Sequence, residues 1–242
     1  MSGKGELRKA MLRYNLVAVG LDRKYTPYHD MTTDAGRRTS LVGLRRLGGL
    51  AWMAPECTTW VWIGRMQTGR HNDIEGNYSR SVVEANTVRD FIVFMCLVAH
   101  WSSREFIIEQ PFSTLIHLTL PFSAMLRMTG ASSIATDHGL FAHDPTQRTQ
   151  KKLKLMGTPR WLTTLTVPTP SVNSSVSRRR WAFGACTKTL YTTKVDMITG
   201  QKKTYGKKRD LKLSEHYSAE FSEAIARAFA ATVGATTHAP VL

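Results

Sequence analysis

The chain has 242 residues, of which 42% are hydrophobic and 21% are charged. This composition is typical of a globular protein and excludes an intrinsically disordered one. The formal net charge of +15 is uneven, because residues 151–242 hold sixteen Lys and Arg against five Asp and Glu, whereas residues 51–150 hold seven against nine. A nearly neutral centre with basic flanks favours a core domain that meets a polyanion, so we expect a nucleic acid partner. A basic surface without a partner is the alternative.

The three cysteines, Cys57, Cys96 and Cys186, are too few and too scattered for a disulfide framework or a zinc site. We therefore expect no metal and a reducing intracellular compartment, with the nucleus or an organelle as candidates. The longest apolar run, Phe91–Ala99, is far shorter than the ~20 residues that a membrane span needs. The N-terminus also lacks the apolar segment of a secretory signal.

In chain order, apolar residues at helical spacing predict a short helix over residues 5–14 and a longer one over 33–47. Between them, residues 15–22 (NLVAVGLD) form a Val-rich run that ends in an acid. Such a run is typical of a buried parallel strand.

The same alternation continues downstream. Residues 50–54 (LAWMA) predict a second strand, 60–80 a long loop, 82–101 a helix and 105–109 (EFIIE) a third strand. Strands that alternate with helices predict an α/β fold with a parallel sheet and helical crossovers.

Beyond residue 116 the pattern weakens. We expect a linker or exposed loop over 158–177, a hairpin from 188–194 and 201–205, and a last helix over 218–233 capped by Ser218. The predicted parts are an α/β core over 1–116, an irregular connecting region over 117–180, and a basic hairpin with a C-terminal helix over 181–242.

The first candidate ligand-binding residues in the chain are two glycines. Gly3 and Gly5 stand before a predicted helix, where backbone amides and the positive helix end face a ligand. Asp22 ends the next predicted strand, at the place where an acid binds ribose hydroxyls in dinucleotide-type sheets. The alternatives are a chance glycine pair and an acid that caps a turn.

Two further candidates follow the next predicted strands. Cys57 comes just after residues 50–54, and a thiol there acts as a nucleophile where its thiolate is favoured. Glu109 ends residues 105–109, and a desolvated carboxyl group there holds a proton for a ring nitrogen. A buried structural thiol and an acid paired with an arginine are the alternatives.

Together these residues resemble the cytosine-5 DNA methyltransferases. In that family a Gly-x-Gly loop holds the methionine part of S-adenosylmethionine, successive acids bind its ribose and adenine, a Pro-Cys motif supplies the nucleophile, and a later Glu supports the target cytosine. The resemblance implies a Rossmann-like fold without its first strand and an S-adenosylmethionine cofactor. The residues implied for the cofactor are Gly3, Gly5, Asp22, Asp30 and Pro55, and those implied for catalysis are Cys57 and Glu109.

A closer likeness is to a loosely characterised group of protist proteins with the same core, and it extends over roughly two thirds of the chain. The segments that carry it are Cys57-Thr58-Thr59-Trp60, residues 64–68, Val83-Glu84-Ala85-Asn86 and Glu109-Gln110-Pro111-Phe112-Ser113.

Three features depart from the methyltransferase pattern. Glu56 stands where the family has proline directly before the nucleophile, and a neighbouring acid raises the pKa of a thiol. No separate target-recognition domain is evident. The strand that should precede Gly3 is missing, so we expect that the chain is clipped or that another segment supplies that strand.

Basic residues complete the predicted site. Those expected to contact nucleic acid are Arg65, Arg70 and Arg80 in the region after Cys57, then Arg178, Arg179 and Arg180, and finally Lys207, Lys208 and Arg209. Next to Trp181 and Tyr205, such cations contact phosphates while the rings stack on bases. A solvated face or a nuclear-import signal is the alternative.

The sequence thus predicts an S-adenosylmethionine-dependent methyltransferase-like protein that acts on DNA or RNA. A catalytically degenerate module that binds nucleic acid through its basic C-terminal third is the second hypothesis. A thiol hydrolase that uses Cys57 with His29 or His71 is the third.

Overall fold

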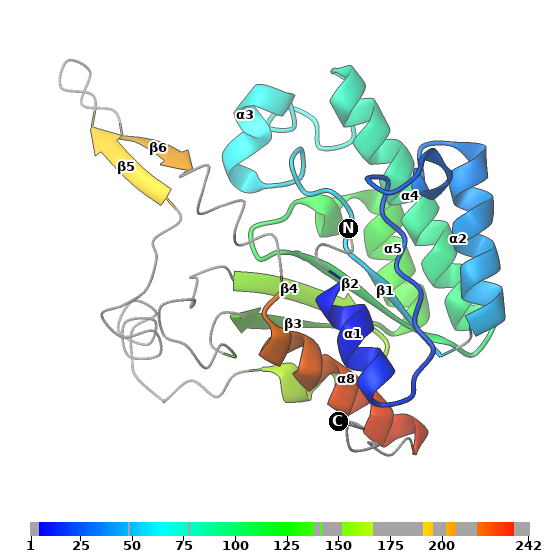
Figure 1. Ribbon diagram of the computed structural model, residues 1–242. Coiled ribbons are helices and arrows are strands. Elements are labelled where there is room, and N and C mark those ends of the chain that lie inside the picture. Colours follow the sequence, from blue (N-terminus) through cyan, green and yellow to red (C-terminus); the bar gives the residue numbers. More distant parts are fainter. Residues whose placement is uncertain are drawn as a thin grey trace.

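The computed structural model describes residues 5–47, 49–76, 78–137, 141, 152–166, 191–195, 202–206 and 217–234. Helices lie on both faces of one sheet, and a separate two-stranded hairpin projects from this body (Figure 1). The predicted α/β class is therefore confirmed.

The sheet has four strands in the order β1-β2-β4-β3. They are β1 (Leu50–Met53), β2 (Glu105–Pro111), β3 (Ser132–Asp137) and β4 (Lys152–Gly157). Only β1 and β2 are parallel, whereas β4 is antiparallel to both of its neighbours. The expected parallel sheet is thus a mixed one. A parallel pair needs a long crossover, and the helix α4 (Arg80–Trp101) lies in the connection from β1 to β2.

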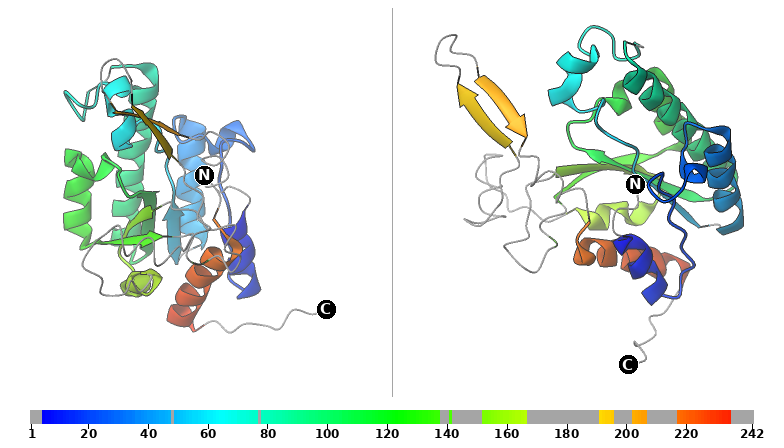
Figure 2. Two further views of the ribbon diagram at one scale, coloured as in Figure 1. Left: turned by 90° about the vertical axis from the view of Figure 1, so that its left-hand side faces the viewer. Right: turned by 45° about the horizontal axis from the view of Figure 1, so that its top comes forward.

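Alternate residues of β2 point to two different hydrophobic cores, as the period of a strand requires. Phe106 and Ile108 pack in the first core, with residues from α2 (Asp34–Leu47), α4 and α5 (Leu120–Thr129). Ile107 packs in the second core, under α1 (Glu6–Arg13) and α8 (Ala219–Val233). Figure 2 shows these two groups of helices on opposite faces of the sheet.

The two terminal helices of the described chain pack together. Arg13 of α1 forms an ion pair of 2.6 Å with Glu223 of α8. The Ser218 hydroxyl accepts a hydrogen bond from the Phe221 amide at 3.1 Å, and so caps α8 as predicted. The predicted helices over 5–14, 33–47, 82–101 and 218–233 are all confirmed.

The predicted strand over 15–22 is wrong. The segment is not in a strand, and among the described residues β1 pairs only with β2. Leu16 and Ala18 pack against the second core, whereas Val17 and Val19 are 78% and 57% exposed. The alternation of a half-buried strand is therefore present, but no strand among the described residues pairs with it.

The predicted boundary at residue 116 does not separate two parts of the described structure. α5, β3 and β4 follow it, and both strands belong to the central sheet. β3 (SSIATD) is mostly polar, so it carries no hydrophobic alternation for a sequence argument to find.

Short helical turns complete the connections. They are η1 (Pro27–His29), η2 (Trp62–Gly64), α3 (Arg65–Thr68), η3 (Ile116–Leu118) and η6 (Arg160–Leu165). The predicted loop over 60–80 thus contains η2 and α3, and η6 lies in the predicted linker over 158–177.

The predicted hairpin is confirmed, with β5 (Tyr191–Val195) antiparallel to β6 (Lys202–Gly206). It projects on the side of the molecule that also carries α3 (Figures 1 and 2). In the part of the chain that the structure describes, no helix has the length and apolar character to span a bilayer.

Candidate functional site

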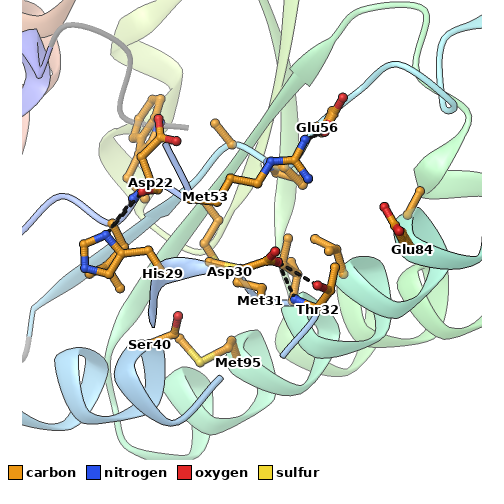
Figure 3. Close-up of a pocket in the computed structure, with 18 of the residues that line it drawn as sticks. Asp22, His29, Asp30, Met31, Thr32, Ser40, Met53, Glu56, Glu84 and Met95 are labelled. Atoms are coloured by element: carbon orange, nitrogen blue, oxygen red, sulfur yellow. Dashed lines mark hydrogen bonds and ion pairs between the residues drawn. The ribbon is translucent and has the colours of Figure 1, made fainter. Parts of the chain in front are cut away.

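A cavity of about 560 Å³ lies between the segment 19–32, α2, α4 and the carboxyl end of β1. Open α/β sheets bind ligands beyond the carboxyl ends of their strands. Three of the predicted cofactor residues, Asp22, Asp30 and Pro55, line this cavity. Figure 3 shows Asp22 and Asp30 on the segment that faces β1.

Asp22 ends the half-buried segment 15–22 described above and is itself buried. Its Oδ1 accepts a hydrogen bond from the Lys24 amide at 3.0 Å, which forms a tight turn. The Nδ1 atom of His29 lies 3.3 Å from the backbone nitrogen of Asp22. The turn therefore holds both side chains at the wall of the cavity.

Asp30 follows η1 and is held by a second turn of the same kind. Its Oδ1 accepts hydrogen bonds from the amide and the hydroxyl of Thr32, at 2.9 and 2.7 Å. Burial raises the pKa of Asp30, but the two hydrogen bonds from Thr32 and the charge of Arg23 outweigh it and hold the pKa below its ordinary value. Asp30 is therefore an ionised hydrogen-bond acceptor at neutral pH.

A glycine of α2 allows the Asp30 turn to approach the helix. A Cβ atom on Gly36 would lie 1.9 Å from the carbonyl oxygen of Asp30. Any larger residue would push the turn away from α2, so Gly36 sets the position of this wall of the cavity.

The cavity also has an ion pair beside it and an apolar floor. Arg23 and Glu56 approach to 2.6 Å, which ties the segment after Asp22 to the segment after β1. The Thr58 hydroxyl donates to the other Glu56 oxygen at 3.0 Å. Glu56 stands where the methyltransferase pattern has proline, and its negative charge is thus paired with the positive charge of Arg23. Apolar side chains that line the cavity include Met31, Leu44, Met53, Ile92 and Met95.

Cys57 lies in the turn after β1 and is half-buried. Its carbonyl oxygen accepts hydrogen bonds from the amides of Trp60 and Val61, at 2.9 and 3.2 Å. Its neighbours Glu56 and Thr58 line the cavity, but Cys57 is not among the lining residues. The structure thus places the predicted nucleophile next to the cavity wall.

Glu109 is buried at the end of β2 and faces α8. Its Oε2 accepts a hydrogen bond from the Tyr217 hydroxyl at 2.9 Å, and that hydroxyl accepts one from Trp52 Nε1 at 3.0 Å. Burial and the charge of Glu109 raise the pKa of Tyr217 well above its ordinary value, so the hydroxyl stays a donor. The predicted catalytic carboxylate is therefore covered by Tyr217.

The histidines of the thiol hydrolase hypothesis have other contacts. His29 lies against the Asp22 backbone, and His71 Nδ1 is 3.4 Å from the Arg65 carbonyl oxygen. Both rings therefore lie against backbone atoms.

The prediction that Arg70 binds nucleic acid does not fit its burial. Its guanidinium stacks on the Trp60 ring, with Cζ 3.4 Å from the ring centroid, and donates to Asn86 Oδ1 at 2.8 Å. Burial, with the nearby charge of Arg89, lowers the pKa of Arg70 to about 10. The side chain is therefore structural.

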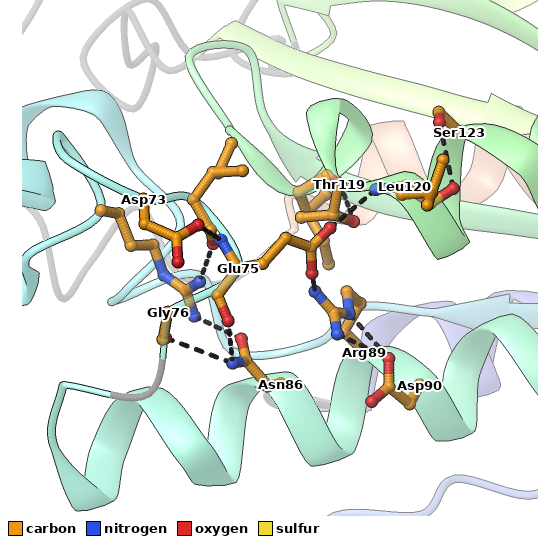
Figure 4. Close-up of polar contacts among 12 residues, drawn as sticks. Asp73, Glu75, Gly76, Asn86, Arg89, Asp90, Thr119, Leu120 and Ser123 are labelled. Atoms are coloured by element: carbon orange, nitrogen blue, oxygen red, sulfur yellow. Dashed lines mark hydrogen bonds and ion pairs between the residues drawn. The ribbon is translucent and has the colours of Figure 1, made fainter.

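Through its contacts with Asn86 and the Ile74 carbonyl, Arg70 joins a polar cluster that holds the loop 69–76 on α4. Figure 4 shows Glu75, Asn86 and Arg89 of this cluster. Asn86 donates to the backbone carbonyls of Glu75 and Gly76. Arg89 pairs with Glu75 and, at 2.7 Å, with Asp90. The Leu120 amide donates to the remaining Glu75 oxygen at 2.7 Å, which joins the loop to the start of α5. Asn86 is the last residue of the Val83-Glu84-Ala85-Asn86 motif quoted above, and its contacts in this cluster give it a structural role.

The other predicted cations lie at the surface or outside the described residues. Arg65 stacks on the Trp62 ring, with Cζ 3.1 Å from the centroid. Arg80 is almost fully exposed and pairs with Glu84 at 2.9 Å. Gly3, Arg178, Arg179, Arg180, Lys207, Lys208 and Arg209 lie outside the described residues.

Gly5 has φ +72° and precedes α1. It does not line the cavity, and α1 packs against α8.

Sequence reasoning missed several residues of the cavity. Thr32 and Ser40 line it and do not belong to any motif singled out in the sequence, and His29, which was named only for the thiol hydrolase hypothesis, lines it as well. Thr32 could have been found, because a Thr two residues after an Asp is the pattern of a side-chain turn. Among the described residues, no group of three His, Cys, Asp or Glu side chains is arranged to hold a metal ion.

The structure defines a mixed α/β protein with an acid-lined cavity at the carboxyl end of a strand. No protein-family model matches the chain, and no curated protein and no solved structure matches it significantly.

Proposed function

We propose that the chain is an S-adenosylmethionine-dependent methyltransferase-like protein that acts on nucleic acid. The observation that carries the proposal is the cavity, which collects Asp22, Asp30 and Pro55 from separate parts of the sequence. These are three of the five residues that the resemblance to cytosine-5 methyltransferases implies for the cofactor.

The residues of the cavity fit an adenosine-containing ligand. Its volume of about 560 Å³ lies within the ~300–1,000 Å³ of small-molecule sites. Ionised Asp30 accepts hydrogen bonds from amino or hydroxyl groups, and Asp22 offers a second carboxylate. Met31, Leu44 and Met53 supply apolar contacts for a flat ring. A bound S-adenosylmethionine would supply the methyl group.

The chain's own residues would act on the base. In the reaction that the resemblance implies, the Cys57 thiolate adds to C6 of a flipped-out cytosine and Glu109 holds the ring at N3. Pairing of Glu56 with Arg23 reduces the repulsion that Glu56 would exert on the thiolate. To contact the base, Glu109 would have to give up its hydrogen bond with the Tyr217 hydroxyl.

The test is transfer of tritiated methyl groups from S-adenosylmethionine to DNA and RNA. We expect transfer by the wild type and none by Cys57→Ser. Cys96→Ala, which changes a buried core thiol, serves as the control and should keep activity in proportion to its folded fraction. Transfer that survives in Cys57→Ser would overturn the catalytic role of Cys57.

A second candidate is a methyltransferase-fold module that binds nucleic acid without catalysis. The contact between Tyr217 and Glu109 favours it, since that carboxylate is buried and already hydrogen-bonded. Isothermal titration with S-adenosylmethionine separates the candidates. Micromolar binding supports the first, and binding that is absent or only millimolar supports the second.

A further inference from the structure

Two exposed aromatic rings on the segments that follow β1 and β2 lie beside half-buried cations of α3 and β4. We call this set the aromatic–cation surface, and its members are Trp62, Arg65, Phe112, Lys152 and Lys154. Of these five residues, only Arg65 is among the site residues predicted from the sequence.

Backbone contacts make the surface continuous. The Trp62 amide donates to the Ser113 carbonyl at 3.1 Å, and Val61 forms an isolated bridge with Thr114. The Phe112 amide donates to the Lys152 carbonyl at 2.9 Å. The segments that carry the two rings and the two lysines are therefore fixed side by side.

Each ring is exposed and has a cation above it. Trp62 is 52% exposed and Phe112 is 45% exposed. The Lys152 and Lys154 Nζ atoms lie 4.3 and 5.6 Å from the Phe112 centroid, and Arg65 stacks on Trp62. An exposed ring can stack on a base of a nucleic acid while the cation beside it contacts the neighbouring phosphate.

The cations of the surface differ in their surroundings, and burial lowers the pKa of Lys154 below its ordinary value. Within the described residues, Arg65, Lys152 and Lys154 form no ion pair with a carboxylate. Lys154 Nζ lies 3.1 Å from His117 Nε2, and burial together with Lys154 lowers the pKa of His117, so the ring adds no charge at neutral pH. Asp137 is the residue directly opposite Lys152 in the β3–β4 register.

The surface begins directly after the Cys57 turn. The Cys57 carbonyl accepts from Trp60 and Val61, and the Trp60 carbonyl accepts from the Leu115 amide at 2.6 Å. A strand that lies across Trp62 and Phe112 would thus pass next to Cys57. The basic hairpin β5–β6 projects on this side of the molecule (Figure 1).

We propose that the aromatic–cation surface binds single-stranded nucleic acid, with bases stacked on Trp62 and Phe112 and phosphates at Arg65, Lys152 and Lys154. The inference deepens the proposed function, because it names the strand that would bring a base to Cys57. Unpaired bases are required, since the rings of a duplex are already stacked on each other.

The test is fluorescence anisotropy without any cofactor, with labelled 20-nucleotide oligo-dT, oligo-rU and a duplex of the same length. We expect both single strands to bind more tightly than the duplex. Trp62→Ala and Phe112→Ala should each weaken single-strand binding about tenfold, the loss of one stacked base. Trp62→Phe should restore most of it. The double variant Lys152→Ala/Lys154→Ala should lower the slope of log affinity against log salt by about 1.4, that is ~0.7 for each lost phosphate contact.

Trp101→Ala is the control, because Trp101 is 68% exposed at the far end of α4, and it should leave affinity unchanged. Single-strand affinity that is unchanged in Trp62→Ala and Phe112→Ala, or equally reduced in Trp101→Ala, would overturn the proposal. A difference between oligo-dT and oligo-rU tells DNA from RNA. The assay contains no cofactor and therefore tests strand binding independently. If the protein bound single strands but not S-adenosylmethionine, the proposed methyltransferase function would fail while the strand-binding proposal would stand.

Discussion

The carboxylates of Asp30 and Glu109 were both predicted to act in the site, and their surroundings are opposite. Asp30 lines an open cavity and is held ionised by Thr32. Glu109, at the end of β2, is buried under Tyr217 on the face of the sheet that α8 covers. The same type of side chain thus serves as an available acceptor in one place and as part of a packed core in the other. The type of side chain alone does not decide between these roles.

The largest expected effect concerns the wall of the open cavity. Gly36→Ala places a Cβ atom against the Asp30 carbonyl, so we expect it to lower the free energy of unfolding by about 3 kcal/mol or more. Gly43→Ala is the matched control in the same helix, because its Cβ would meet no atom within 4 Å. Gly43→Ala should be neutral or stabilise by up to about 1 kcal/mol. Urea unfolding measures both, and equal stability of the two variants would contradict the account of Gly36.

The next effect concerns the buried cation. Arg70→Met keeps a long side chain on Trp60 but removes the donors to Asn86 and to the Ile74 carbonyl. We expect a loss of about 2–3 kcal/mol in the free energy of unfolding, whereas exposed Arg80→Met should lose at most about 0.5 kcal/mol. Urea unfolding is the measurement. A stable Arg70→Met variant with weakened nucleic acid binding would return Arg70 to the surface role first predicted for it.

Tyr217→Phe tests the covered carboxylate directly. It removes the hydroxyl that donates to Glu109 and accepts from Trp52, and it leaves both groups without this partner. We expect the free energy of unfolding to fall by about 1–2 kcal/mol. Tyr28→Phe, at an exposed ring of η1, should change it by less than about 0.5 kcal/mol. If both substitutions had the same effect, the contact with Glu109 would not contribute to stability.

The smallest effect is the pH dependence of the open carboxylate. Because the pKa of Asp30 is lowered on folding, its ionised form stabilises the protein above the pKa of the unfolded chain, near 3.8. That stabilisation is lost as pH falls through the lower pKa of the folded state. Asp30→Asn should therefore be less stable than the wild type at pH 6 and should approach it at pH 3. A stability difference that does not change with pH would contradict the lowered pKa.

Much of the fold followed from local patterns, because α1, α2, α4, α8 and the β5–β6 hairpin bury regular apolar faces or carry clear turns. β3 was missed because its polar sequence leaves no alternation to detect, whereas β4 (KLKLMG) carries an alternation of Lys and Leu that could have indicated a strand. Asp22 could be predicted from the apolar segment that it ends, whereas Asp30 and Pro55 were implied by the resemblance to the cytosine-5 methyltransferases. The burial of Arg70 could not be predicted, because it depends on Trp60 and Asn86, which lie 10 and 16 positions away.

The central claim is that the cavity between segment 19–32 and β1 binds an S-adenosylmethionine-type ligand. Methyl NMR of the protein labelled at its methionines tests it directly, because Met31, Met53 and Met95 line the cavity while Met128 lies exposed on α5. On titration with S-adenosylhomocysteine, we predict shifts of the Met31, Met53 and Met95 signals that saturate together, with Met128 unchanged. Signals that stay in place up to millimolar ligand, or that shift equally at Met128, would contradict the claim.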